Sequence, residues 1–265
     1  DPAEGESTIT PYLMLAALHD GLLRPTAGQA SAPSLAESWA MAKDVTSAEF
    51  TLRKARFHNG DPVTAEDVKF SFERYRGGAA KVLKDNVKEI QILAPNRVRF
   101  VFKAAWPDFP AFYGTFVASA GWVVPKKYVE RVGEEGYRKA PIGAGPYKFV
   151  SFNPGVELVV EAFDGYWRKA PSIKRIVFRS LPDETTRAAA LKSGEVDLAM
   201  LLSGPTAQEI KRTPGLRLAA PLLGIFWLDF PDQWDSKSPW ADRRVRLAAS
   251  LALDRQALSE AETLG

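Results

Sequence analysis

Alternation of apolar and polar residues predicts two β-hairpins in the middle of the chain. The first pairs residues 89–93 with residues 97–103 across a Pro-Asn turn, and the second pairs residues 146–152 with residues 156–163 across an Asn-Pro-Gly turn. A further strand is predicted at residues 173–178. Strands of this period bury one face and expose the other, so we expect sheets with one solvated side.

Capping residues predict two helices in the first third of the chain. Residues 10–18 begin with Thr-Pro and continue as an apolar run, which gives an N-cap and a proline in the first turn, and Gly21 follows as the stop. Residues 64–67 resemble a capping box with Asp in place of Glu, and they open a helix through Phe72.

The last third of the chain is mainly helical by the same signals. A helix is predicted at residues 183–192 with Gly194 as its stop, and residues 196–198 are predicted to return as a short strand. The region from residue 242 to the end is predicted to be helical, with a break at Asp254. The order of elements indicates a mixed α/β (α+β) fold with several hairpins, not a regular βαβ array.

Composition excludes several classes of protein. The chain has 265 residues, enough for one large or two modest domains, and 46% of them are apolar and 25% charged, as is usual for soluble proteins. No apolar run reaches the roughly 18 residues of a membrane span, so we expect no membrane insertion. Cysteine is absent, which excludes disulfides, zinc–cysteine sites and a thiol nucleophile.

Charge does not indicate a nucleic-acid-binding protein. The net charge is +3, and residues 51–103 carry twelve basic and six acidic side chains. At residues 97–103, however, basic and apolar residues alternate, which is typical of the solvent face of a strand. We therefore expect no nucleic-acid partner.

Candidate catalytic and metal-binding residues are few. The two histidines, His19 and His58, have no partner at metal-ligand or nucleophile–base spacing, so a structural role is expected for each. The G-x-G at residues 143–145 precedes Pro146 and a strand, whereas a dinucleotide fingerprint opens a helix. The sequence predicts no enzyme, no cofactor and no metal site.

Aromatic residues gather at residues 106–113, which include Trp106, Phe109, Phe112 and Tyr113. Such a cluster can line an apolar cleft or form a core beneath a long loop. The sequence leaves both interpretations open.

A resemblance to a known family adds a sharper expectation. Residues 50–74, FTLRKARFHNGDPVTAEDVKFSFER, closely resemble the signature of the family 5 extracellular solute-binding proteins, the dipeptide, oligopeptide and nickel ABC importer binding proteins. Other segments of the chain are also similar to segments of the family and occur in the same order, at residues 35–39, 166–197 and 242–255. PIGAGPY at residues 141–147 is similar to the family's P-x-G-T-G-P-Y, with Ala144 in place of the usual Thr.

The resemblance implies a fold and a domain organisation. The fold would be that of a periplasmic binding protein of type II, and residues 1–265 would form the large first lobe of a two-lobed class C protein. Within it, residues of about 40–165 would form an inserted subdomain that contains hairpins. Family members continue into a second lobe and then return to the first, so we expect the second lobe and the return segment to be absent from this chain.

The resemblance also implies a function. The protein would be the substrate-binding component of an ABC importer, capturing a short peptide in a cleft and delivering it to the transmembrane permease subunits. The alternative solutes within the same role are a nickel chelate, an opine or an oligosaccharide. The expected location is the periplasm, or the cell exterior with a membrane anchor in a Gram-positive source. A hydrolase would need a nucleophile beside a base, which the sequence does not offer.

Ligand contacts in the first lobe of the family come from the loop before the first helix and from loops near the cleft rim. In this sequence they map to Glu6, Ser7, Thr8, Ile9, Phe112, Tyr113 and Trp122. In peptide-binding relatives the acidic residue that pairs with the ligand's ammonium lies in the second lobe, so no residue here is assigned that role. With one wall of the cleft only, we expect the chain to bind its solute poorly.

Overall fold

The structure is a computed structural model that describes residues 1–4, 9–26, 29–113, 120–219 and 227–263. The chain divides into two compact units, residues 1–180 and 181–265. Among the described residues, no helix is both long and apolar enough to span a membrane.

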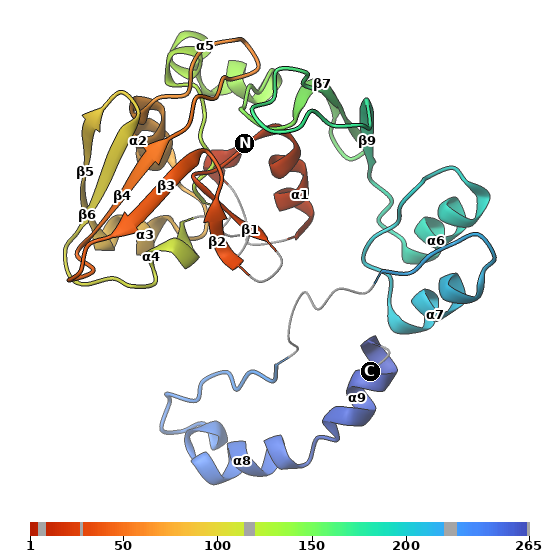
Figure 1. Cartoon of the computed structure of the whole chain (residues 1–265). Coiled ribbons are helices and arrows are strands. Elements are labelled where there is room, and N and C mark those ends of the chain that lie inside the picture. Colours follow the sequence, from red (N-terminus) through yellow and green to blue (C-terminus); the bar gives the residue numbers. More distant parts are fainter. Residues whose placement is uncertain (5–8, 27–28, 114–119, 220–226, 264–265) are drawn as a thin grey trace. The chain divides into compact units, whose positions relative to one another are not determined.

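The larger sheet of the first unit has four antiparallel strands in the order β3-β4-β6-β5 (Figure 1). They are β3 (Ala36–Met41), β4 (Ser47–Leu52), β5 (Val87–Ala94) and β6 (Arg97–Phe102). The hairpin of β5 and β6 confirms the first predicted hairpin. One face of the sheet is packed against α2 (Ala65–Arg74) and α3 (Ala80–Asn86).

The alternation in β4 and β6 separates core from solvent. Phe50 and Phe100 are fully buried and meet edge to face, with ring centroids 5.7 Å apart. On the opposite face Glu49 accepts hydrogen bonds from Arg97 and Arg99, so each exposed cation lies across from a carboxylate. The basic stretch is therefore the solvent face of a sheet, as predicted.

The capping box at the start of α2 is confirmed. The carboxylate of Asp67 accepts hydrogen bonds from the backbone N–H of Thr64 (2.9 Å) and from its hydroxyl (2.7 Å). The other oxygen of Asp67 accepts from the backbone N–H of Lys126, at the start of α5 (Lys126–Lys139), at 2.8 Å. One buried carboxylate thus begins one helix and holds the beginning of another.

A second, three-stranded sheet has the order β7-β8-β9 and is antiparallel throughout. Its strands are β7 (Tyr147–Asn153), β8 (Glu157–Ala162) and β9 (Arg175–Arg179), which confirm the second hairpin and the strand after it. Helix α1 (Ile9–Leu18) packs on β7, and Leu18 shares a small apolar cluster with Tyr147, Leu158 and Val160. A two-stranded hairpin, β1 (Leu23–Thr26) and β2 (Gln29–Pro33), follows α1.

The segment at residues 143–145 passes so close to the end of α1 that side chains have no room. A Cβ atom on Gly143 would lie 2.0 Å from the carbonyl oxygen of Leu18, and one on Gly145 would lie 2.5 Å from the carbonyl carbon of the same residue. Strand β7 begins two residues after Gly145. The prediction that this G-x-G is a tight entry into a strand is confirmed.

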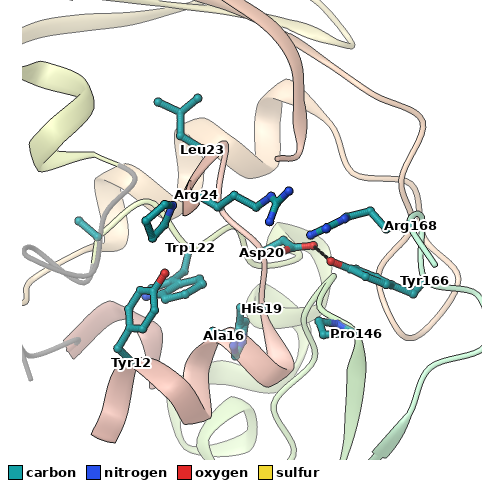
Figure 2. Close-up of a pocket in the computed structure, with 13 residues that line it drawn as sticks. Tyr12, Ala16, His19, Asp20, Leu23, Arg24, Trp122, Pro146, Tyr166 and Arg168 are labelled. Atoms are coloured by element: carbon teal, nitrogen blue, oxygen red, sulfur yellow. Dashed lines mark hydrogen bonds between the residues drawn. The ribbon is translucent and has the colours of Figure 1, made fainter. Parts of the chain in front are cut away.

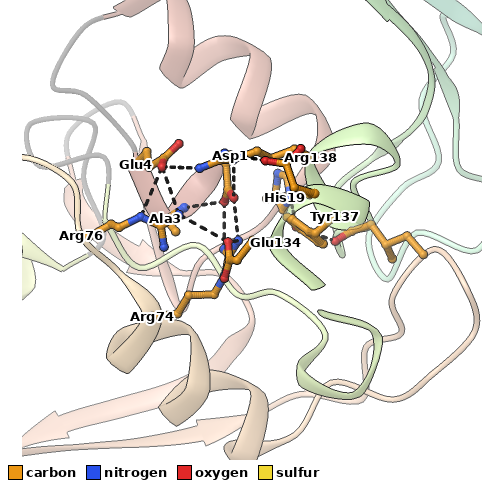
Figure 3. Close-up of polar contacts among 11 residues, drawn as sticks. Asp1, Ala3, Glu4, His19, Arg74, Arg76, Glu134, Tyr137 and Arg138 are labelled. Atoms are coloured by element: carbon orange, nitrogen blue, oxygen red, sulfur yellow. Dashed lines mark hydrogen bonds and ion pairs between the residues drawn. The ribbon is translucent and has the colours of Figure 1, made fainter. Parts of the chain in front are cut away.

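The short helix η1 (Pro2–Glu4) is tied to the first unit by ion pairs (Figure 3). The guanidinium of Arg74 donates to both carboxylate oxygens of Asp1 (2.9 and 2.6 Å) and to both oxygens of Glu134 (2.8 and 2.6 Å). Arg74 ends α2, Glu134 lies in α5 and Asp1 directly precedes η1, so one guanidinium joins two helices and the residue before a third. The side chains of Arg74 and Asp1 are only 5% and 1% exposed.

The second unit is helical in its described residues. It contains α6 (Glu184–Ser193), α7 (Gly204–Arg212), η2 (Pro239–Ala241), α8 (Arg243–Leu251) and α9 (Arg255–Thr263). Helix α6 is capped as predicted, by Asp183 at its start and by Gly194 in the left-handed conformation (φ 76°) at its end. The gap between α8 and α9 lies at the predicted break.

The strand predicted at residues 196–198 is wrong. A strand needs a neighbour to pair with, and the described part of this unit contains none. The segment that follows is held by a side chain instead, because Arg187 of α6 donates to the carbonyl oxygens of Met200 (3.2 Å) and Leu201 (2.9 Å).

Candidate functional site

A cavity of about 230 Å³ lies in the first unit beside α1 (Figure 2). Its walls come from α1, the segment that follows it, residues 120–122, the start of β7 and the loop after β8. The lining residues are Tyr12, Ala16, His19, Asp20, Gly21, Leu23, Arg24, Pro25, Ala120, Trp122, Pro146, Tyr166 and Arg168. The cavity therefore combines aromatic rings, one carboxyl group and two guanidinium groups.

Tyr12 and Trp122 form an aromatic wall of the cavity. Their ring centroids are 5.2 Å apart and the ring planes are tilted by 46°. The backbone of Trp122 is bridged to Gly21, and the next residue, Val123, donates its N–H to the carbonyl of Asp20 at 3.1 Å. Because these backbone contacts fix the segment, Trp122 is presented to the cavity by a rigid part of the chain.

Asp20 is a buried carboxyl group, only 8% exposed. One of its oxygens accepts hydrogen bonds from the hydroxyl of Tyr166 (2.9 Å) and from the indole N–H of Trp167 (2.7 Å). Burial raises the pKa of Asp20 to about 6, although these two donors and the nearby guanidinium groups act in the opposite direction. The carboxyl group therefore titrates just below neutral pH.

Two guanidinium groups share the cavity with Asp20. Figure 2 shows the ends of Arg24 and Arg168 pointing toward each other beside the Asp20 carboxyl. The Nε of Arg24 is buried and has no hydrogen-bond partner among the described residues. Asp20 supplies at most one negative charge against two positive charges, so the cavity has an excess of positive charge.

His19 also lines the cavity, and it is neutral. Its Nε2 lies 2.9 Å from the hydroxyl of Tyr137, and that hydroxyl donates to the carbonyl of Ile142 at 3.0 Å. The Nδ1 of His19 faces the carbonyl oxygen of Leu15 at 3.3 Å, so both ring nitrogens have a hydrogen-bond partner. Burial lowers the pKa of His19 to about 3, so the ring adds no charge at neutral pH.

His58 fastens the glycine segment beside the cavity. Its Nδ1 accepts from the backbone N–H of Gly143 (3.2 Å), and its Nε2 donates to the carbonyl of Gly145 (3.0 Å). Burial lowers the pKa of His58 to about 4, and this neutral tautomer satisfies both bonds. Both histidines thus have packing partners that explain them, in agreement with the structural role predicted.

The residues predicted to face a ligand fall in different surroundings. Trp122 lines the cavity. Ile9 begins α1, whereas Glu6, Ser7 and Thr8 lie outside the described residues. Their part in ligand binding stays a prediction.

The other two predicted residues belong to the aromatic cluster at 106–113. Tyr113 is 1% exposed and stacks on Phe109 of α4 (Phe109–Phe112), with centroids 5.2 Å apart and planes 15° apart. Phe112 is partly buried and packs against the same core beside Trp106. Of the two interpretations left open, the structure favours core packing for most of this cluster, and neither Tyr113 nor Phe112 lines the cavity.

Sequence reasoning missed five polar or aromatic residues of the cavity, namely Tyr12, Asp20, Arg24, Tyr166 and Arg168. One local signal was present, because Asp20 stands alone between the apolar run of α1 and a pair of leucines. The partners of Asp20 were beyond reach, since Tyr166 and Trp167 are 146 and 147 residues away. Within the described part of the chain, no group of three His, Asp or Glu residues could hold a metal ion.

Comparison with known proteins identifies relatives. The family model for bacterial extracellular solute-binding proteins, family 5 Middle, matches residues 31–262. The chain is 27% identical over 256 residues to Heme-binding protein A of Haemophilus influenzae, and the match covers 86% of this chain and 46% of that protein. It is also 27% identical over 256 residues to the dipeptide-binding protein of Escherichia coli K12, and this match covers 86% of the chain and 47% of that protein.

A solved structure is similar to most of the chain. The periplasmic binding protein AgaA of A. tumefaciens R10, in complex with agropinic acid, has a TM-score of 0.71 and 27% sequence identity, and the match covers 79% of this chain and 45% of AgaA. Its fold is that of the type II periplasmic binding proteins, and the mixed α/β architecture of the present chain matches it. The chain spans less than half the length of each of these three proteins.

Proposed function

Because the chain belongs to family 5 of the bacterial extracellular solute-binding proteins, we propose that it is part of the substrate-binding component of an ABC importer. In this role it captures a short peptide in a cleft and delivers it to the transmembrane permease. The observation that carries the proposal is the cavity beside α1, where an aromatic pair and opposite charges line one wall. A peptide offers matching groups, since it has two charged termini and side chains that pack on aromatic rings.

The proposal extends to the organisation of the whole protein. Residues 1–265 form the first lobe, with residues of about 40–165 as an inserted subdomain, and a second lobe closes over the solute. The lengths of the relatives support this, since each is more than twice as long as the segment it shares with this chain. The protein works in the periplasm, or outside the cell on a membrane anchor, as a partner of permease subunits.

An acidic non-peptide solute such as an opine is the second candidate. The structurally similar AgaA holds agropinic acid, and the cavity of the present chain has an excess of positive charge. The relatives that match differ in solute, with heme, a dipeptide and agropinic acid among them. Family membership alone therefore does not choose the solute.

Mild denaturation of the full-length protein releases the ligand that co-purified with it. Mass spectrometry of this ligand tests the proposal. We expect a short peptide, and calorimetry with that peptide should give a dissociation constant below about 10 μM. Recovery of an opine or another acid would replace the peptide and keep the transport role. A protein that carries no solute and binds none from a library of peptides and opines would contradict the proposal.

We also propose that the protein is not an enzyme. The relatives reported above are binding proteins, and the two histidines serve as buried hydrogen-bond partners. Chromatography of peptides and esters after prolonged incubation with the protein should show no product. Turnover that disappears when a single serine or histidine is replaced would overturn this.

A further inference from the structure

Among the residues that line the cavity, Asp20 is the one anion against two positive charges. Arg24 lies on β1 and Arg168 lies in the loop between β8 and β9, and both line the cavity. The ion pairs of the described residues include neither of them, and the buried Nε of Arg24 has no hydrogen-bond partner there. A buried donor without an acceptor is unfavourable, so the cavity is suited to an acceptor that the described residues do not supply.

Asp20 balances only one of the two positive charges. Its accepting oxygen is already bound by two neutral donors, the Tyr166 hydroxyl and the Trp167 indole, at 2.9 and 2.7 Å. A second anion between the guanidinium groups would leave the charge balanced, with two positive and two negative groups. The planar fork of a guanidinium matches the two oxygens of a carboxylate.

We propose that this cavity binds a carboxylate group of the solute between Arg24 and Arg168, while an apolar part of the same solute packs on Tyr12 and Trp122. The inference rests on the proposed function, because the carboxylate belongs to the transported molecule. It adds which chemical group the first lobe recognises and which residues hold it. A cavity of about 230 Å³ has room for the end of a solute and not for a large one, so the remainder extends out of it.

A matched pair of probes tests the inference without knowledge of the natural solute. 3-Phenylpropionate carries a ring and a carboxylate, and 3-phenylpropanamide has the same shape without the charge. Binding of each to the full-length protein is measured by calorimetry and by the change in tryptophan fluorescence. We expect the acid to bind at least about tenfold more tightly than the amide, because its bonds to guanidinium are charge-assisted.

Variants assign the preference to the two arginines. Arg24→Gln and Arg168→Gln should each reduce the preference for the acid to about twofold or less, and Arg24→Lys should retain part of it. Lys169→Gln is the control, because Lys169 is exposed, follows Arg168 directly and does not line the cavity. It removes the same charge and should leave the preference unchanged. Arg168 is exposed, so the Arg168→Gln variant is expected to fold. It therefore tests the inference even if the Arg24 variant does not fold.

The outcomes separate this inference from the proposed function. Equal binding of acid and amide, absence of binding by the acid, or a preference that survives in both arginine variants would overturn the carboxylate site. If one of these results is obtained and mass spectrometry still finds a peptide in the same preparation, the proposed transport role is unaffected. A merely structural role of Arg24 would lower stability without changing the ratio of acid to amide affinity.

Discussion

At the scale of single residues, Trp122 and Tyr113 are both aromatic, and both were expected to face a ligand, yet their surroundings differ. Trp122 lines the cavity, whereas Tyr113 is 1% exposed and its hydroxyl has no partner among the described residues. Trp122→Ala should weaken solute binding by about 1–3 kcal/mol, measured by calorimetry on the full-length protein, because it removes one ring of the aromatic wall. Unchanged affinity would show that Trp122 only supports the fold.

Tyr113→Phe is the companion change. It removes a buried hydroxyl that lacks a hydrogen bond and keeps the ring stacked on Phe109, so solute affinity should not change. Stability should stay equal or rise by about 1 kcal/mol, since no satisfied bond is lost. Chemical denaturation measures this. A loss of affinity with normal stability would instead restore Tyr113 as a ligand contact.

The two histidines predict a dependence of stability on pH. In the folded protein the pKa values of His19 and His58 are about 3 and about 4, and an unfolded histidine has a pKa near 6.5. Below pH 6.5 the unfolded chain takes up protons that the folded chain excludes, so the free energy of unfolding falls as the pH falls. At pH 5 each histidine lowers the free energy of unfolding by about 2 kcal/mol relative to neutral pH.

Asp20 acts in the opposite direction. Its pKa of about 6 lies above the value of an unfolded aspartate, so the folded chain holds a proton at pH 5 that the unfolded chain has released. This offsets about 1 kcal/mol of the loss at pH 5. Since the sequence contains only two histidines, their imidazole NMR signals can be followed directly. We expect neither to titrate between pH 8 and 5, and a midpoint near 6.5 for either would contradict this account.

At the scale of elements, the bidentate contacts of Arg74 join α2 to α5 and to Asp1, the residue before η1. Arg74→Met would leave the carboxylate of Asp1, 1% exposed, with only the more distant guanidinium of Arg138, whose Nε lies 3.9 Å away, and we expect a loss of about 3 kcal/mol in the free energy of unfolding. Urea denaturation measures it. Adding Asp1→Asn to this variant should recover part of the loss, because the buried negative charge is removed.

An exposed ion pair provides the control for Arg74. Lys81 and Asp85 are paired on α3, and their side chains are 86% and 59% exposed. Lys81→Met should change stability by less than about 0.5 kcal/mol, because water screens this pair. Equal losses in the two variants would mean that burial does not determine the strength of these ion pairs.

At the scale of the whole molecule, the second unit exposes large apolar side chains. Among its described residues Trp234, Leu251, Leu198 and Leu201 are each more than 60% exposed. Apolar surface of this kind favours association. We expect the isolated chain of 265 residues to associate as its concentration rises in sedimentation velocity experiments.

Replacing Leu198 and Leu251 by Gln should reduce this association, while Leu93→Gln on β5 in the first unit serves as a comparison. We also expect the isolated chain to bind the solute at least about tenfold more weakly than the full-length protein, because one wall leaves the solute half solvated. Equal affinities in calorimetry would show that this lobe suffices, and a monomer at all concentrations would contradict the expected association.

Much of the fold was determined by the sequence itself. The capping box at 64–67, the left-handed Gly194 and the two hairpins each depend on residues a few positions apart, so a local pattern is enough to predict them. The family signature at residues 50–74 also lies in scaffold, since the residues that line the cavity include none of these positions. That is why the signature identified the family and left the site unassigned.

The tertiary structure alone decided the site. Asp20 becomes a buried carboxyl only when the loop at Tyr166 and Trp167 folds over it, and Arg24 meets Arg168 only across the same contact. The failed strand at 196–198 has the same origin, because pairing depends on a neighbour that the local sequence does not specify. Burial, charge balance and strand pairing are properties of contacts between distant residues, and the period of a sequence carries no information about them.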